Sequence, residues 1–323
     1  MLLVGTETGV VALEEAEGRW RVAWRALEGQ AVAALAFRRG QPSHLLAATY
    51  SGGVFRSEDG GRSWRQVLGR DAWAVGVAPD GRAYAGLKPA AVARSADGGA
   101  TWEDLTERLR RLPTYDTWDA PFPPYTAHVR TLAFAPGSPA VVYGGVEVGG
   151  VIRSRDGGDT WEEVRNGVHP DVHTLVVAPA DPATLYAATG GGFYRSFDEG
   201  ASWEGAQRGM RHRYTRAVAV HPAEPRTVLT ATLKGPPGSW RGPSGADATL
   251  YRSRDGGDTW EALGGGLPQP MVGGLEALAV DPQRPERVVA GLSTGEVWAS
   301  ADGGDTWQAV ATGVGGVNSF AFA

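Results

Sequence analysis

Short apolar runs recur along the chain, and most of them end at a proline. One run covers residues 129–136 and ends at Pro136; another covers residues 172–179 and ends at Pro179. Apolar runs of about 4 to 8 residues that stop at turn residues predict buried β-strands. We expect seven equivalent strands of this kind, at residues 32–39, 72–79, 129–136, 172–179, 215–222, 275–282 and 317–323.

A second repeated pattern is a polar octapeptide that ends in tryptophan. It reads Ser-x-Asp-x-Gly-x-Thr/Ser-Trp and lies between two strand-like runs. The Asp carboxylate can accept hydrogen bonds from backbone N–H groups of the turn, and Gly adopts the positive φ that a reversal needs. We therefore predict a strand, a tight turn and a strand at each of six copies: 57–64, 95–102, 154–161, 196–203, 253–260 and 300–307.

A calcium-binding loop is the alternative for these acidic turns. An EF-hand loop requires oxygen ligands at its first, third and fifth positions. If such a loop began at Asp156 in the copy at 154–161, its third position would be Gly158, which has no side-chain oxygen. We therefore interpret the octapeptides as structural turns.

The octapeptide resembles the Asp-box, or BNR repeat, of sialidases, sortilin-type receptors, some xyloglucan-cleaving hydrolases and photosystem II assembly factors. The resemblance covers nearly the whole chain. It implies a β-propeller in which each box joins the two outer strands of a blade. Because these families differ in activity, the resemblance implies a scaffold and no single function.

The two patterns also give the number of blades. Residues 13–20 form a degenerate octapeptide, so Trp20 joins the six octapeptide tryptophans and makes seven outer strands. The chain begins with a second strand at residues 2–6 and ends with a lone first strand at 317–323. We expect an all-β fold, a single seven-bladed β-propeller over residues 1–323 that is closed by the C-terminal strand joining the N-terminal blade.

Composition excludes several classes of protein. The 47 Gly and 21 Pro are too many for a helical protein, and the absence of Cys excludes disulfides and thiol chemistry. A net charge of −5 argues against nucleic-acid binding. No apolar run reaches 18 residues, which argues against a membrane span. We expect a cytoplasmic monomer without membrane or nucleic-acid partners.

Two insertions break the repeat, at residues 105–128 and 234–249. If each first strand runs downward, both insertions lie on the upper face and the octapeptide turns lie on the lower face. Long loops in a compact repeat often carry function. The insertions contribute Trp118, His128 and Trp240 as candidate ligand contacts, although the tryptophans could instead pin the loops to the rim. Residues 106–112 should form a short helix.

Aligned first strands carry polar residues at their upper ends, where they should face the axial channel. The ends of the second strands give a neighbouring ring. Together the two rings form the predicted binding site at the channel mouth. The first ring is Ala33, Trp73, Arg130, His173, Arg216, Glu276 and Asn318, and the second is Thr6, Tyr50, Lys88, Glu147, Thr189 and Ser293.

Arginines at 208–216 and 108–111 should make the upper face basic. This favours a carbohydrate, a carboxylate-bearing ligand, or an acidic peptide or protein as the partner. The alternative function is a glycoside hydrolase, which needs two carboxylates around one bond; Glu147 and Glu276 are the best placed pair. A sialidase-like enzyme would instead use an arginine cluster and a tyrosine such as Tyr50, Tyr115 or Tyr214.

The chain lacks features on which catalysis depends in the enzymes that it resembles. Sialidases have six blades and an Arg-Ile-Pro signature that this chain lacks, and xyloglucan hydrolases of this repeat type pair two propellers. A metal site made of His128, His173 and Glu147 is conceivable, but we expect no metal and no cofactor. We expect a propeller that binds a ligand or protein partner on its upper face, with hydrolysis as the alternative.

Overall fold

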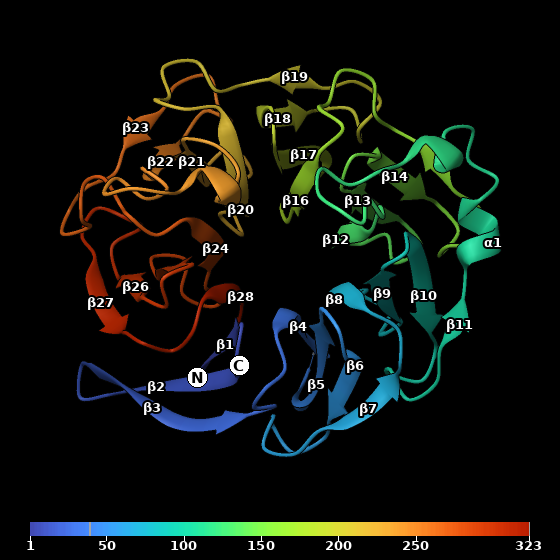
Figure 1. Ribbon diagram of the computed structural model, residues 1–323, viewed down its shortest axis with the longest axis horizontal. Coiled ribbons are helices and arrows are strands. Elements are labelled where there is room, and N and C mark those ends of the chain that lie inside the picture. Colours follow the sequence, from blue (N-terminus) through green and yellow to red (C-terminus); the bar gives the residue numbers. More distant parts are fainter. Residues whose placement is uncertain (39, 323) are drawn as a thin grey trace.

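The computed structural model describes residues 1–38 and 40–322. Within these residues, seven four-stranded antiparallel sheets surround a central axis, so the predicted seven-bladed propeller is confirmed (Figure 1). Arg39 and Ala323, at the ends of two predicted first strands, lie outside the described residues. No described helix is long and apolar enough to cross a membrane.

Each blade has the same order of strands from the axis outward. The first strands are β4 (Val32–Arg38), β8 (Ala72–Val77), β12 (Val129–Phe134), β16 (Val172–Ala178), β20 (Tyr214–Val220), β24 (Leu275–Val280) and β28 (Val317–Phe322). The second strands are β5 (Gln41–Thr49), β9 (Ala83–Leu87), β13 (Val142–Val146), β17 (Asp181–Thr189), β21 (Val228–Leu233), β25 (Val288–Leu292) and β1 (Leu2–Thr6).

The outer half of each blade is the hairpin around the octapeptide turn. The third strands are β6 (Gly53–Ser57), β10 (Ala91–Ser95), β14 (Gly150–Ser154), β18 (Gly192–Ser196), β22 (Thr249–Ser253), β26 (Val297–Ser300) and β2 (Gly9–Ala16). The fourth strands are β7 (Arg65–Leu68), β11 (Glu103–Asp104), β15 (Glu162–Glu163), β19 (Glu204–Gly205), β23 (Glu261–Ala262), β27 (Gln308–Ala311) and β3 (Arg19–Ala26).

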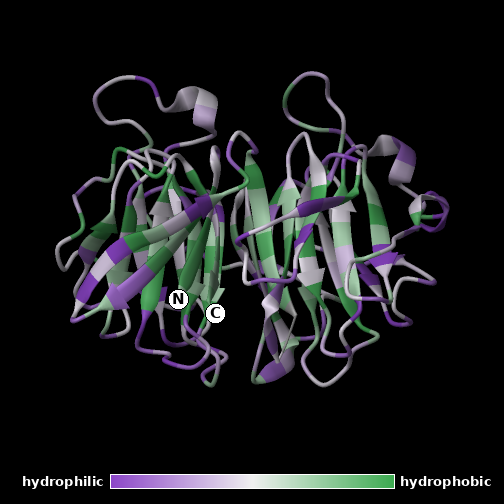
Figure 2. Cartoon of the chain, turned by 90° about the horizontal axis from the view of Figure 1, so that it is seen from below, coloured by the Kyte–Doolittle hydropathy of each residue, from purple (hydrophilic) through white to green (hydrophobic). Residues whose placement is uncertain are grey.

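The two insertions contain the short helices of the described residues. Helix α1 (Thr106–Leu109) and the 3-10 turn η1 (Tyr115–Thr117) lie in the first insertion, and the 3-10 turn η2 (Pro237–Ser239) lies in the second. The predicted helix at 106–112 therefore ends three residues early. Two loops rise from the same end of the ring in Figure 2, and both insertions line one cavity there.

Apolar side chains fill the spaces between neighbouring blades. Tyr143 and Val151 of one blade, for example, pack with Leu175 and Leu185 of the next. Figure 2 shows hydrophobic residues concentrated along the strands and hydrophilic residues in the loops. Full burial of each large apolar side chain stabilises the fold by about 1.5–3 kcal/mol. Most of the stability therefore comes from contacts between blades.

The octapeptide turns are held by a repeated set of hydrogen bonds. In one copy the Ser253 hydroxyl donates to Asp255 Oδ1 over 2.7 Å and accepts the Gly257 N–H over 2.8 Å. The Thr259 N–H and hydroxyl donate to the two Asp255 oxygens. Gly257 has a φ of +100°, which a residue with a Cβ rarely adopts. The predicted structural role of the octapeptide follows from these bonds.

An arginine before each of five octapeptides links its blade to the next one. Arg252 Nη1 donates to the Gly303 carbonyl of the following turn over 2.9 Å, and Nη2 lies 2.6 Å from Asp305. Arg56, Arg94, Arg153 and Arg195 make the same kind of bond to the next turn. The sixth octapeptide has Ala299 at this position, and the blade that follows it has the degenerate turn. The arginine thus occurs where the next blade offers an octapeptide turn to receive it.

The C-terminal strand closes the ring. Strand β28 pairs antiparallel with β1, from Leu2 opposite Phe322 to Thr6 opposite Val317, and the two termini lie next to each other in Figure 1. Val317 is fully buried against Leu2 and Val4. The predicted closure is confirmed.

Removal of residues 317–323 should strongly destabilise the propeller. The truncated chain would lose the β1 pairing and the burial of Val317, Phe320 and Phe322, worth more than about 5 kcal/mol in total. Thermal denaturation should show a much lower Tm or aggregation. Thr312→Ala, in an exposed loop, is the control and should unfold like the intact chain; an unchanged Tm in the truncation would contradict the closure.

The octapeptide carboxylates should make the protein sensitive to acid. Hydrogen bonds from Thr259, which outweigh the effect of burial, hold the pKa of Asp255 well below its usual range. A lowered pKa in the folded state adds stability above about pH 4 that is lost as the pH falls further. Asp255→Asn should therefore cost about 1 kcal/mol at neutral pH, and the difference from the parent chain should shrink near pH 2.

Thermal denaturation across this pH range measures the effect. Asp116→Asn, at an exposed carboxylate with no hydrogen bond to a described residue, is the matched control and should change little at any pH. A difference between Asp255→Asn and the parent that does not depend on pH would show that the carboxylate charge is unimportant.

Candidate functional site

Two adjoining cavities lie at the upper end of the axial channel. The inner one, of about 190 Å³, is lined by all seven residues of the first predicted ring. The outer one, of about 380 Å³, lies at the mouth between the two insertions. They share Tyr50, Trp73, Arg130, Arg216, Glu276 and Asn318.

Each residue of the first ring lies on an irregularity in strand pairing. In β12 the pairing with β13 passes from Val129 directly to Thr131, which leaves Arg130 without an opposite residue. Such β-bulges re-aim side chains and are common beside functional sites. The same break occurs at Ala33, Trp73, His173, Arg216, Glu276 and Asn318. The bulges explain how seven side chains of first strands can reach the channel.

An aromatic group lines one side of the mouth. The ring of Trp73 lies 3.7 Å from that of His128 and 4.5 Å from that of Tyr50, between centroids. Lys88 Nζ and the Arg130 guanidinium each lie 5.6 Å from the Trp73 ring centroid, a distance suited to cation–π attraction. Lys88 has no carboxylate partner among the described residues. Its ammonium group is therefore available to an anion in the cavity.

Arg130 holds the first candidate catalytic carboxylate. Its Nη1 donates to Glu147 Oε2 over 2.5 Å, and His128 Nε2 lies 2.9 Å from the same oxygen. Burial alone would raise the pKa of Glu147, but Arg130 and His128 outweigh it and hold that pKa well below its usual range. Burial also lowers the pKa of His128. Glu147 therefore stays ionised and cannot act as a proton donor near neutral pH.

Arg216 holds the second candidate carboxylate in the same way. Its Nε donates to Glu276 Oε2 over 2.5 Å, and its Nη1 lies 3.3 Å from the Tyr214 hydroxyl. Both partners of the ion pair are nearly buried. Burial raises the pKa of Tyr214 and of Tyr50, so both hydroxyls stay protonated and are weak nucleophiles. Glu147 therefore does not suit the proton-donor role of a glycosidase, and neither tyrosine has the lowered pKa of an activated nucleophile.

The insertions form the walls of the outer cavity. Ala120, Phe122 and Pro123 line it from the first insertion, and Pro237 and Trp240 from the second. Trp240 Nε1 donates to the carbonyl of Gly235 over 2.7 Å, and its ring lies so close to Gly274 that a Cβ there would collide with it. The loop is thus anchored while one face of Trp240 lines the cavity.

Most predicted site residues gather at the mouth, with four exceptions. Trp118 is buried in the core beside α1, donates to Thr114 and lines neither cavity. The hydroxyls of Thr6 and Thr189 bond to carbonyls of their own hairpins. Arg108, expected on the upper face, instead pairs with Asp159 of a lower-face turn. Lys88, His128, Glu147, Ser293 and Trp240 do line the outer cavity, and His173 lines the inner one.

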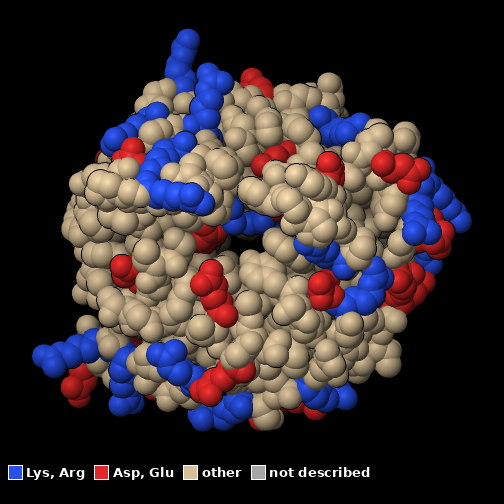
Figure 3. Space-filling view, viewed as in Figure 1, with Lys and Arg blue, Asp and Glu red and all other residues tan. Residues whose placement is uncertain are grey.

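Charges of both signs surround the central hollow seen in Figure 3. Lys88, Arg130 and Arg216 line the outer cavity together with Glu7, Glu147 and Glu276. The expected basic surface is therefore locally balanced at the mouth by carboxylates. Glu7, Phe122 and Asp171 were not among the predicted site residues, because each lies outside the aligned strand positions.

No family model and no curated protein matches this chain. Solved structures do match. An ancestral GH74 enzyme has 18% identity and a TM-score of 0.68, covering 90% of this chain and 38% of that one. The GH74 xyloglucanase from Xanthomonas campestris has 22% identity and a TM-score of 0.65, covering 87% and 45%.

A structure of YCF48 bound to a D1 peptide is similar as well. It has 17% identity and a TM-score of 0.60, covering 86% of this chain and 81% of that one. YCF48 from Cyanidioschyzon merolae has 16% identity and a TM-score of 0.60, covering 87% and 86%. This chain therefore spans less than half of those two GH74 chains and most of the YCF48 chains. At such identities the similarity shows a shared β-propeller fold.

Breaking a channel ion pair should cost far more than breaking a surface pair. Glu276→Ala would leave Arg216 nearly buried without a carboxylate, at a cost of about 3–5 kcal/mol. Glu107→Ala, which breaks the exposed pair with Arg110, should cost no more than about 1 kcal/mol. Denaturant unfolding of the two variants makes the comparison. Equal losses would mean that the channel pair is as well solvated as the surface one.

Proposed function

We propose that this propeller binds an acidic peptide or protein segment at the channel mouth on the upper face. The carboxylates of the peptide would pair with cations of the propeller. The observation that carries the proposal is Lys88, a cation that lines the outer cavity and has no carboxylate partner among the described residues. Arg130 and Arg216 are held by Glu147 and Glu276. Lys88 is therefore the group that an incoming carboxylate can pair with at least cost.

Exposed apolar side chains on or beside the two insertions support a polypeptide partner, and one of them, Phe122, lines the outer cavity. Phe122 and Tyr125 on the first insertion are 48% and 59% exposed, and Val272, which contacts the second insertion, is 54% exposed. Exposed apolar groups with a polar centre suit a protein interface. The similar fold of YCF48, whose structure contains a bound D1 peptide, provides an example of a propeller with this use.

Glycoside hydrolysis is the second candidate, because GH74 enzymes share the fold. It would use Glu147 and Glu276 as the carboxylate pair. A hydrolase needs one carboxyl group that holds a proton until the bond breaks. The arginine that pairs with each carboxylate opposes this requirement, so the binding function has the better support.

Binding of labelled synthetic peptides tests the proposal. Peptides rich in Asp and Glu should raise fluorescence anisotropy with the full chain, whereas peptides with Asn and Gln in the same places should not. Lys88→Gln should weaken binding about tenfold or more, since a hydrogen bond to a charged group contributes about 1.5–3 kcal/mol. Lys234→Gln is the matched control: this other lysine bonds to its own loop and lines neither cavity.

Two results would overturn the proposal. Acidic peptides that bind no better than their amide counterparts would exclude carboxylate recognition, and equal affinities of Lys88→Gln and the parent would exclude this site. Turnover of chromogenic glycosides that is lost in both Glu147→Gln and Glu276→Gln would replace binding with hydrolysis.

A further inference from the structure

Asp171, a carboxylate next to Glu147, has no arginine or lysine partner among the described residues. Asp171 directly precedes β16, and its side chain is 15% exposed. Its carboxylate accepts no hydrogen bond from an aligned donor among the described residues, and Oδ1 is fully enclosed. A buried carboxylate is costly unless a cation or several donors compensate its charge. Asp171 therefore calls for a positive group beside it.

The nearby arginines are already engaged. Arg130 pairs with Glu147 and Arg216 pairs with Glu276, each over 2.5 Å. Neither guanidinium group forms an ion pair with Asp171, so its charge has no arginine partner among the described residues. His173 Nε2, at 3.3 Å, is the nearest group to Asp171 Oδ1 that could supply a counter-charge.

The hydrogen bonds of His173 fix the orientation of its ring. Nδ1 lies 2.6 Å from the carbonyl oxygen of Thr215, and a carbonyl can only accept, so Nδ1 carries the proton. In the neutral ring Nε2 is then an acceptor, which lies 3.3 Å from the Tyr214 hydroxyl that can donate to it and 3.3 Å from Asp171 Oδ1. A metal-binding imidazole usually has this arrangement, with its other nitrogen donating to a backbone carbonyl.

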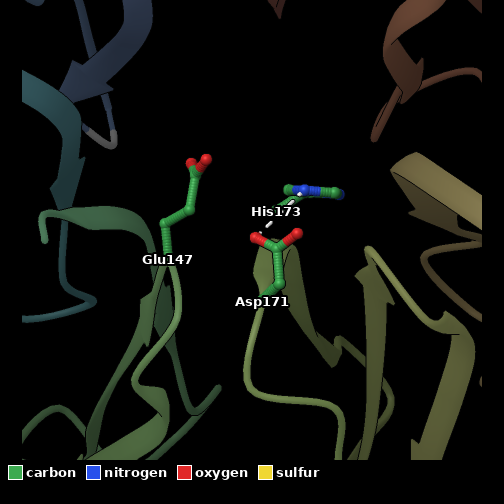
Figure 4. A group of neighbouring side chains, drawn as sticks. All are labelled: Glu147, Asp171 and His173. Carbon is green, nitrogen blue, oxygen red and sulfur yellow. Dashed lines mark ion pairs between the residues drawn. The ribbon is translucent and has the colours of Figure 1, made fainter. Parts of the chain in front are cut away.

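Glu147 completes the group from the neighbouring blade. The hydrogen bond from Arg130 and the contact with His128 go to Oε2, and no hydrogen bond from a described residue reaches Oε1, which leaves Oε1 for another ligand. One donor atom each of Glu147, Asp171 and His173 lie within 4.8 Å of one another. Figure 4 shows the three side chains side by side, with the ion pair between Asp171 and His173 dashed.

We propose that Glu147, Asp171 and His173 bind a divalent transition-metal cation, such as Zn²⁺ or Mn²⁺, in the axial channel. Imidazole and carboxylate donors together suit these ions. The ion supplies the positive charge that Asp171 lacks, and Arg130 remains on the opposite oxygen of Glu147. The metal ligands do not include Lys88, although Glu147 lines the same outer cavity, and the proposal does not depend on the peptide partner.

Direct titration tests the metal site in the full chain after chelator treatment and desalting. Calorimetry with ZnCl₂ and with MnCl₂ should show saturable binding of one ion per chain for at least one of the two. Asp171→Asn, which keeps the shape of the side chain, should weaken binding about tenfold or more. His173→Gln should do the same, and circular dichroism checks that both variants fold.

Two matched variants serve as controls. His221→Gln changes a histidine that lines a different cavity, and Asp116→Asn changes an exposed carboxylate of the first insertion. Both should bind the metal as the parent does. Peptide binding is measured separately, so a failed titration leaves the Lys88 experiment intact.

Three results would overturn the metal site. One is the absence of saturable binding at millimolar metal, and another is an affinity that Asp171→Asn leaves unchanged. The third is a ¹⁵N NMR spectrum, recorded with metal present, in which both ring nitrogens of His173 carry protons. In that case an imidazolium supplies the charge that Asp171 needs.

Discussion

Closure of the ring is the constraint on which the rest of the structure depends. Each blade buries its two faces only against its neighbours, so an open end would expose one whole apolar face and an unpaired strand edge. The pairing of β28 with β1 removes both costs by using the two ends of the chain in one sheet. Closure also fixes the width of the axial channel, because seven blades must meet around it.

Bulges at the upper ends of the first strands direct side chains into the axial channel and so form the candidate site. A regular ladder would alternate side chains between the two faces of each blade. The residues without a partner on the second strand, such as Arg130 and His173, do not follow this alternation, and their side chains line the channel instead. Each of the seven bulges directs one side chain toward the channel, and closure of the ring places these side chains around one axis.

The sequence predicts the fold well because its signals are local and repeated. The octapeptides and the apolar runs specify hairpins by short-range chemistry, and their count gives the blades. The channel residues could be proposed by aligning the repeats. Asp171 could not be proposed in this way. Its role depends on its distance from Glu147 and from the arginines, which are far from it in the sequence. Trp118 packs in the core and lines neither cavity, and composition alone cannot tell such a loop anchor from a ligand contact.

Buried ion pairs contribute little net stability, since desolvation offsets most of their attraction. The pairs of Arg130 with Glu147 and of Arg216 with Glu276 are thus an expensive way to fill a channel that apolar side chains could fill. The arginines between blades cost less desolvation. Arg252, for example, donates to a backbone carbonyl of the next turn and pairs with carboxylates at the surface. The channel charges are better explained as a preorganised polar surface, in which Lys88 has no carboxylate partner and Asp171 has no arginine or lysine partner among the described residues.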